Sequence, residues 1–156
     1  MQIGKLKQCG FTYIGLLIVI AIAGIGMAGV GIVWHQDAQR EREKELLFIG
    51  DAYRKAIASY YENSLGEAKQ FPATLEDLIV DTRFPNTKRH LRKLYKDPMA
   101  FGKPLQLVLQ QGQIIGVYSA SKETPIKKTG FESPYETFGE AVGYSDWKFI
   151  YAPGSV

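Results

Sequence analysis

The sequence is poor in the residues that most often build disulfides, metal sites and catalytic centres. Its single cysteine, Cys9, cannot form an internal disulfide bond, which excludes a small scaffold held together by disulfides. The two histidines, His35 and His90, each lack a second metal ligand at helical spacing, and no nucleophile motif or phosphate-binding loop is present. We therefore expect no metal site, no cofactor and no catalytic residue, and we predict a protein that is not an enzyme.

Charge is also missing from one long stretch, because residues 11–34 contain no Asp, Glu, Lys or Arg. As a helix this run would be about 36 Å long, enough to cross a hydrocarbon core of about 30 Å. A secretory signal peptide usually has an apolar region of only about 7 to 15 residues, and buried core helices seldom stay uncharged on all sides for so long. The run therefore predicts a transmembrane helix that stays in the mature protein. Basic residues flank it on both sides, so the charges do not decide its orientation.

The next stretch predicts that the same helix continues beyond the apolar run. No proline occurs from Gln36 to Asn63, and apolar residues recur at spacings of three and four, which is typical of one buried helical face. Gly66 can adopt the left-handed backbone conformation that commonly ends a helix. We expect one helix of about 54 residues with an amphipathic second half. The members of its apolar face are Leu46, Ile49, Tyr53, Ala56 and Tyr60.

The remaining residues predict short helices followed by strands. A short helix is expected over residues 73–81, with Thr74 as its N-cap, and another over residues 86–95. Alternation of apolar residues then predicts strands within residues 104–119 and 146–152, the first range folding back on itself. In the second range, Trp147, Phe149 and Tyr151 are expected on one face of the strand. The fold class is therefore α+β, with a small antiparallel sheet packed on the amphipathic half of the long helix.

Two polar clusters offer weaker candidates for binding. Five basic residues from Lys88 to Lys96 could contact anionic lipid, DNA or an acidic protein surface, or could simply form a solvated helix face. Three glutamates, Glu132, Glu136 and Glu140, share a spacing of four and could share a helix face, but Pro134 and Gly139 predict a loop there. They also lack the Asp-rich spacing of a calcium-binding loop. The formal net charge of only +3 does not indicate nucleic acid as a partner.

The N-terminal residues carry a resemblance to a known family. The sequence "QCG" followed by "FTYIGLLIVIAIAGIG" resembles the start of type IV prepilins and of the pseudopilins of type II secretion systems. Later segments, "FPATLEDLI" and "LYKDPMAFGKPLQL", resemble parts of the major pseudopilin. The expected order of a long helix and a small antiparallel sheet is also similar to that family's architecture.

This resemblance implies a maturation pathway and a location. Residues 1–10 would be a leader, removed when a prepilin peptidase cuts between Gly10 and Phe11, and the new amino group of Phe11 would be methylated. Residues 11–35 would form the transmembrane and assembly helix. Residues 36–156 would form a periplasmic pilin-like domain that includes the second half of the long helix. The implied protein crosses the inner membrane once, with its N-terminus cytoplasmic, and its implied partners are membrane lipid, other pilin-like subunits and an inner-membrane assembly platform.

Three departures from the family pattern affect the implied role. Gly15 stands where the family usually has Glu, and Met99 stands where Trp is usual. Residues 118–131 contain no Asp, whereas the major pseudopilin has a calcium-binding loop near there. The resemblance therefore implies a structural subunit of a type II secretion pseudopilus or a related type IV filament that supports protein secretion. A minor pilin of a type IV pilus or DNA-uptake system, and an unassembled membrane-anchored binding module, are the alternatives.

Four glycines between Gly24 and Gly31 add a hypothesis about assembly. Each costs about 1 kcal/mol against Ala within a helix, so this stretch is a weak point at which the helix could unwind in a filament.

Overall fold

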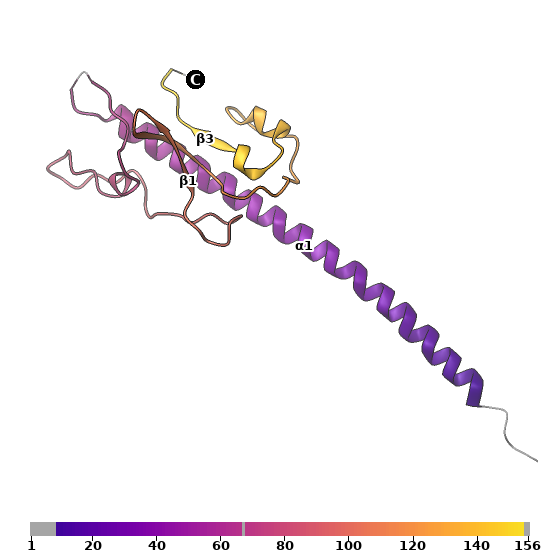
Figure 1. Cartoon of the computed structure of the whole chain (residues 1–156). Coiled ribbons are helices and arrows are strands. Elements are labelled where there is room, and N and C mark those ends of the chain that lie inside the picture. The colour runs from indigo at the N-terminus through magenta and orange to yellow at the C-terminus, as the bar shows by residue number, and fades with distance from the viewer. Residues whose placement is uncertain (1–8, 67, 155–156) are drawn as a thin grey trace, which may run out of the picture. The chain divides into compact units, whose positions relative to one another are not determined.

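The computed structural model describes residues 9–66 and 68–154, but not the side chains of residues 9–12 and 25–33. The described residues form a long helix, three short 3-10 helices and three strands (Figure 1). In chain order these are α1 (Cys9–Glu62), η1 (Glu76–Leu78), β1 (Gln106–Gln110), β2 (Gln113–Tyr118), η2 (Glu136–Glu140), η3 (Tyr144–Asp146) and β3 (Lys148–Ile150). The fold is α+β, and the 54 residues of α1 confirm the predicted length of the helix.

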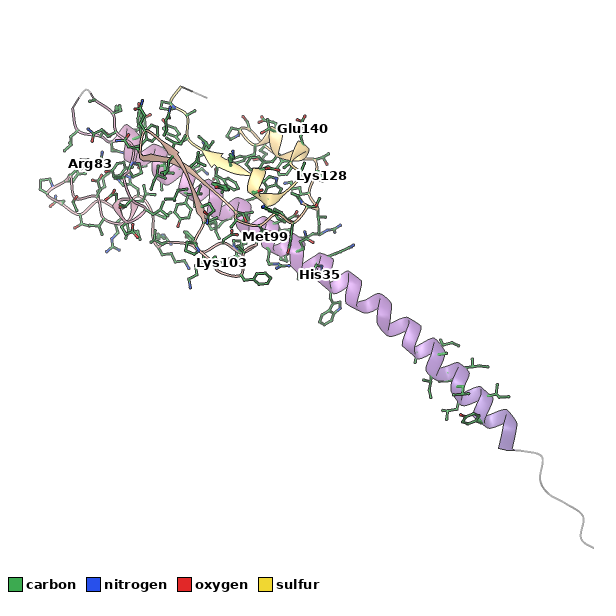
Figure 2. The ribbon with its side chains drawn as sticks, in the orientation of Figure 1. His35, Arg83, Met99, Lys103, Lys128 and Glu140 are labelled. Carbon is green, nitrogen blue, oxygen red and sulfur yellow. The ribbon has the colours of Figure 1, made fainter. Side chains whose placement is uncertain are left out.

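The chain divides into two compact units, residues 1–39 and residues 40–156, which are described separately. In the first unit all described residues belong to α1. Its described apolar side chains point outward from the helix and are largely exposed (Figure 2). They are Tyr13, Ile14, Leu16, Leu17, Ile18, Val19, Ile20, Ile22 and Trp34.

No helix in the described part of the chain is long and apolar enough to cross a membrane. The predicted span over residues 11–34 is therefore not supported by the described residues. The side chains of residues 25–33, which belong to the same predicted span, lie outside the described residues.

In the second unit, the rest of α1 packs on the sheet through the predicted apolar face. All five members of that face are buried, and together with Ile57 they join one hydrophobic cluster. The other side of this cluster comes from the sheet, through Ile114 and Val117 of β2 and Phe149 of β3. Burial of the predicted face confirms that the period of three and four marks the core side of the helix.

The sheet has three antiparallel strands in the order β1-β2-β3. Strands β1 and β2 form a hairpin whose two turn residues, Gln111 and Gly112, both have positive φ, at 52° and 80°. This is the conformation that two-residue hairpin turns require. Of the three residues predicted on one face of β3, Trp147 directly precedes the strand and Phe149 lies in it, and both are buried, whereas Tyr151 is only half-buried. The ring of Phe149 lies so close to α1 that a Cβ atom at Gly50 would overlap it.

The short helix predicted over residues 73–81 is reduced to the three residues of η1. The residue before it is Leu75, which makes no side-chain cap bond, so the prediction of Thr74 as N-cap is wrong. Instead, the Asp77 carboxylate accepts hydrogen bonds from the backbone N–H groups of Ala73 and Thr74, at 3.2 and 2.9 Å. Backbone bonds from residues 90 and 91 to the Leu78 carbonyl group follow directly, and they tie this segment to the next one.

The second short helix, predicted over residues 86–95, is absent from that range, all of which is described. The backbone is extended there, because Lys88 pairs with Asp81 in an isolated antiparallel bridge. The basic residues of the range consequently do not form one helix face. Tertiary bonds to residues distant in sequence have overridden a weak helical propensity.

Candidate functional site

The predicted processing site lies at the start of α1. The helix begins at Cys9, so the peptide bond between Gly10 and Phe11 lies in its first turn. The side chains of both residues lie outside the described residues. Cleavage at this bond and methylation of Phe11 therefore stay predictions that follow from the resemblance.

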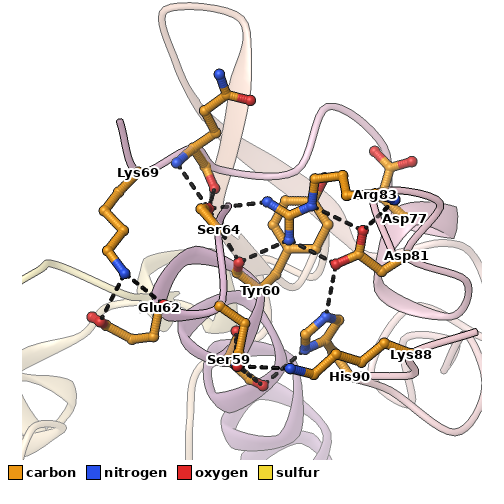
Figure 3. Close-up of polar contacts among 12 residues, drawn as sticks. Ser59, Tyr60, Glu62, Ser64, Lys69, Asp77, Asp81, Arg83, Lys88 and His90 are labelled. Carbon is orange, nitrogen blue, oxygen red and sulfur yellow. Dashed lines mark hydrogen bonds and ion pairs between the residues drawn. The ribbon is translucent and has the colours of Figure 1, made fainter. Parts of the chain in front are cut away.

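The most elaborate polar cluster in the structure is centred on Asp81, near the C-terminal end of α1 (Figure 3). The Arg83 guanidinium donates two hydrogen bonds to its carboxylate, with Nε 2.9 Å from Oδ1 and Nη2 2.7 Å from Oδ2. His90 Nε2 lies 3.2 Å from Oδ2 on the other side. The hydrogen bonds from Arg83 lower the pKa of Asp81 from 3.8 to about 2, so this buried carboxylate is ionised at neutral pH.

The Arg83 guanidinium also closes the end of the helix. Its Nη2 group donates to the carbonyl oxygen of Tyr60 at 3.0 Å, and its Nη1 group donates to Ser64 Oγ at 3.0 Å. Its Cζ atom lies 3.6 Å from the centre of the Tyr60 ring. The last carbonyl groups of a helix have no partner within the helix, so Arg83 stabilises α1 and attaches the segment of residues 79–90 to it.

The same cluster brings together a serine, a histidine and an aspartate, which the sequence gave no reason to associate. His90 Nδ1 lies 2.8 Å from Ser59 Oγ, and because Asp81 is ionised, Nε2 donates to Asp81 while Nδ1 accepts from Ser59. A hydrolase with these groups needs an exposed nucleophile and N–H donors for an oxyanion. Here the His90 side chain is only 1 % exposed, and Ser59 lies inside α1, where backbone N–H groups are already bonded along the helix.

The cluster therefore acts as a fastening between α1 and residues 79–90 rather than as a nucleophile. Burial lowers the pKa of His90, although the neighbouring Asp81 carboxylate opposes this effect. His90 is thus neutral at pH 7 and serves as a hydrogen-bonding link between the helix and the loop. The sequence interpretation of His90 as an ordinary polar residue missed this role, since its partners lie 31 and 9 residues away.

A second buried carboxylate, Glu43, fastens the long segment between β2 and β3 to α1. Its Oε1 atom accepts hydrogen bonds from the backbone N–H groups of Ile126 and Lys127, at 2.6 and 3.2 Å, and from the Tyr144 hydroxyl group at 2.8 Å. Glu43 is only 3 % exposed. Three donors to one oxygen compensate for the loss of hydration when this group is buried.

A third buried carboxylate, Asp97, holds the loop before β1 to the end of β2. Its Oδ1 atom accepts from the backbone N–H of Met99 at 2.9 Å. Its Oδ2 atom accepts from the Ser119 hydroxyl group and the Ala120 backbone N–H, at 2.8 and 2.9 Å. Met99 is a buried core residue of this loop.

The other polar candidates lie apart from these clusters. His35 is exposed on α1, and the three glutamates of residues 132–140 are exposed, with Glu136 and Glu140 at the two ends of η2. Among the five basic residues of the 88–96 range, Lys88 donates to Asn63 at 2.7 Å, whereas Arg89 and Arg92 are exposed. Over the described residues, no group of three or more His, Cys, Asp or Glu side chains is placed to hold a metal ion.

Comparison of the chain with protein-family models, with curated proteins and with solved structures found no match in any of the three.

Proposed function

We propose that this chain is a pilin-like structural subunit of a type II secretion pseudopilus or a related type IV filament. The observation that carries the proposal is the apolar surface of α1 between Tyr13 and Ile22. Eight large apolar side chains there are each 48 to 64 % exposed. Exposed apolar area costs about 25 cal/mol per Å², so a helix of this kind is stable in the cell only when lipid or other protein covers it.

The arrangement of the second unit supports the same proposal. A long helix packed through one face on a three-stranded antiparallel sheet is the architecture that the resemblance to pseudopilins implies. The three buried carboxylates fasten the irregular segments to α1 and to β2, which gives a subunit that would keep its shape when neighbours pack around it. In a filament, the first half of α1 would lie against the same helix of other subunits.

The processing step is tested by mass spectrometry of the mature chain. We expect a chain that begins with N-methylated Phe11, and we expect Gly10→Val to leave the precursor uncut in cells that contain a prepilin peptidase. Normal maturation of that variant would count heavily against the proposal.

Assembly is tested by cysteine crosslinking, for which the sequence is well suited. Cys9 is the single cysteine and belongs to the proposed leader, so the mature chain would contain no thiol. A Leu17→Cys substitution in a Cys9→Ser background places one thiol on the exposed apolar surface of α1. We expect crosslinked multimers, and their loss when Gly10→Val is added. Multimers that persist in the uncut precursor would show that contact does not depend on processing.

The proposed location before assembly is the inner membrane, with a single span, the N-terminus cytoplasmic and the C-terminal domain periplasmic. The uncharged run of residues 11–34 supports it, whereas no spanning helix was found among the described residues. Alkaline carbonate extraction of the Gly10→Val precursor tests the span directly. Release of the precursor into the soluble fraction would contradict this part of the proposal.

A minor pilin of a DNA-uptake system is the second candidate, and the exposed Arg89 and Arg92 favour it. Phosphate contacts make DNA affinity fall steeply as salt rises. Binding of the full chain to duplex DNA that weakens with salt, and weakens again in Arg89→Gln/Arg92→Gln, would support this candidate over a secretion subunit. An unassembled binding module would instead give mature, methylated chain without crosslinks.

A further inference from the structure

A cleft in the second unit has the chemistry of an anion site. It has a volume of about 380 Å³ and lies between α1 and the segment that joins β2 to β3. Four cationic side chains line it, two from each of these segments: Arg40, Lys44, Lys127 and Lys128. Glu43 is the one acidic residue in the lining. Lys128 lies on the joining segment, as Figure 2 shows.

Glu43 offsets only one of these four positive charges. Its Oε1 atom already accepts three hydrogen bonds, from two backbone N–H groups and the Tyr144 hydroxyl group. Outside the lining, Glu41 pairs with Lys44 at 2.7 Å, but both side chains are more than 70 % exposed, so the pair is weak. The cleft therefore keeps a net positive charge at neutral pH.

Two of the cations, Lys127 and Lys128, are also held in position before any ligand arrives. The hydrogen bonds from residues 126 and 127 to Glu43 fix the backbone that carries Lys127 and Lys128. The Lys128 ammonium donates to the Ala141 carbonyl group at 3.0 Å, which leaves two of its three protons for a ligand. The Lys127 ammonium lies 4.6 Å from the centre of the Phe131 ring. Fixed charges lose less conformational entropy on binding than mobile ones.

We propose that this cleft binds a phosphate ester. A phosphate group presents several oxygens to a guanidinium and to ammonium groups at once, which suits four cations around one space. The volume exceeds that of a lone phosphate, and Leu47 and Ile126 add an apolar side to the cleft. These features fit the glycerophosphate part of an anionic lipid, or a soluble phosphate ester of similar size. The site does not depend on filament assembly, and would remain if the chain proved to be an unassembled protein.

The test uses the full chain in a zwitterionic detergent and isothermal titration calorimetry. The ligands are short-chain phosphatidylglycerol, short-chain phosphatidylcholine, glycerol 3-phosphate and inorganic phosphate. We expect phosphatidylglycerol to bind at least tenfold more tightly than phosphatidylcholine, with an affinity that falls as salt rises. Saturable binding of the two soluble phosphates would assign the site to the phosphate group itself, and binding of the anionic lipid alone would assign it to a lipid headgroup. Equal binding of both lipids without binding of either soluble phosphate would overturn the proposal.

A pair of matched variants distinguishes binding in this cleft from nonspecific attraction to surface charge. Arg40→Gln/Lys127→Gln removes two of the cations, and neither side chain donates a hydrogen bond within the described part of the chain. Lys103→Gln/Lys148→Gln removes the same charge from exposed positions outside the cleft. We expect affinity for the phosphate ligand to fall roughly fivefold to tenfold in the first variant and by less than twofold in the second. Equal losses in the two variants would refute the site, and the single variant Lys127→Gln provides the same comparison if the double variant melts at a lower temperature.

Discussion

The substitution Gly50→Ala sets two physical effects against each other. Gly50 is the one glycine in the buried half of α1, and a glycine within a helix costs about 1 kcal/mol against alanine. On helical propensity alone, Gly50→Ala would stabilise the protein by about that amount. In the folded chain, however, an added Cβ atom would overlap three atoms of the Phe149 ring.

The surroundings of Phe149 decide which effect is larger. The ring is fully buried, and it packs edge to face on Phe138 and Tyr135, with ring centres 5.2 and 5.4 Å apart. It can therefore move only if β3 moves away from α1. Overpacking of this kind typically costs about 1 to 3 kcal/mol, and a direct overlap with a ring lies at the upper end. We expect a net loss of about 1 to 2 kcal/mol in the free energy of unfolding.

Urea unfolding followed by the fluorescence of the buried Trp147 measures this loss. Gly24→Ala is the matched control, because a Cβ atom there meets nothing within 4 Å, and it should not lower stability. In a double-mutant cycle, Phe149→Leu should reduce the cost of Gly50→Ala by about 1 kcal/mol, since it removes the overlapping ring atoms. An increase in stability for Gly50→Ala alone would refute the packing of β3 on α1.

Two further outcomes follow from the buried carboxylates. Glu43→Ala should lower the free energy of unfolding by about 2 to 4 kcal/mol, because it removes the acceptor of two backbone N–H groups and of a hydroxyl group. Tyr144→Phe removes only one of these hydrogen bonds and should cost about 1 kcal/mol. Equal losses of the two variants in urea unfolding would contradict the geometry of this contact. The pKa of Asp81 falls from 3.8 to about 2 on folding, so its ionised form contributes about 2 kcal/mol of stability above pH 4, which is lost as the pH falls toward 2. Burial lowers the pKa of His90 as well, so stability should already begin to decline as the pH falls below 6.5. In thermal melts at a series of pH values, the melting temperature should therefore fall less steeply toward acid pH in Asp81→Asn than in the wild-type chain. Identical slopes in the two proteins would rule out the paired carboxylate.

The elements that the sequence predicted well are those with a strong local pattern. The repeat from Leu46 to Tyr60 fixed the core face of α1 because helical periodicity is set by the backbone alone. The strand residues Trp147 and Phe149 were likewise assigned to one buried side by the period of two. The α+β class follows from these two patterns without any knowledge of distant contacts.

The sequence predicted wrongly where the backbone of a segment is hydrogen-bonded to residues outside that segment. The range of residues 86–95 has the composition of a helix, yet Lys88 pairs with Asp81 and the backbone N–H groups of His90 and Leu91 bond to Leu78. Helical propensity differs by less than about 1 kcal/mol per residue among ordinary residues, so a few such bonds outweigh it. The Thr74 cap failed for a local reason, since the Asp77 carboxylate, within the same segment, accepts from the backbone N–H groups of Ala73 and Thr74.

The sequence by itself determined the long helix, its apolar face, the uncharged first part and the strand pattern, because each depends on the order of neighbouring residues. Only the tertiary structure decided what Glu43, Asp81 and Asp97 do, since each of them binds a group that is not its neighbour in the sequence. The largest separation is 9 residues for Asp81 and 101 residues for Glu43, and that of Asp97 lies between them. The cleft beside Glu43 belongs to the same category. Its four cations come from two segments more than 80 residues apart, and their meeting depends on the hydrogen bonds that bring residues 126 and 127 to Glu43.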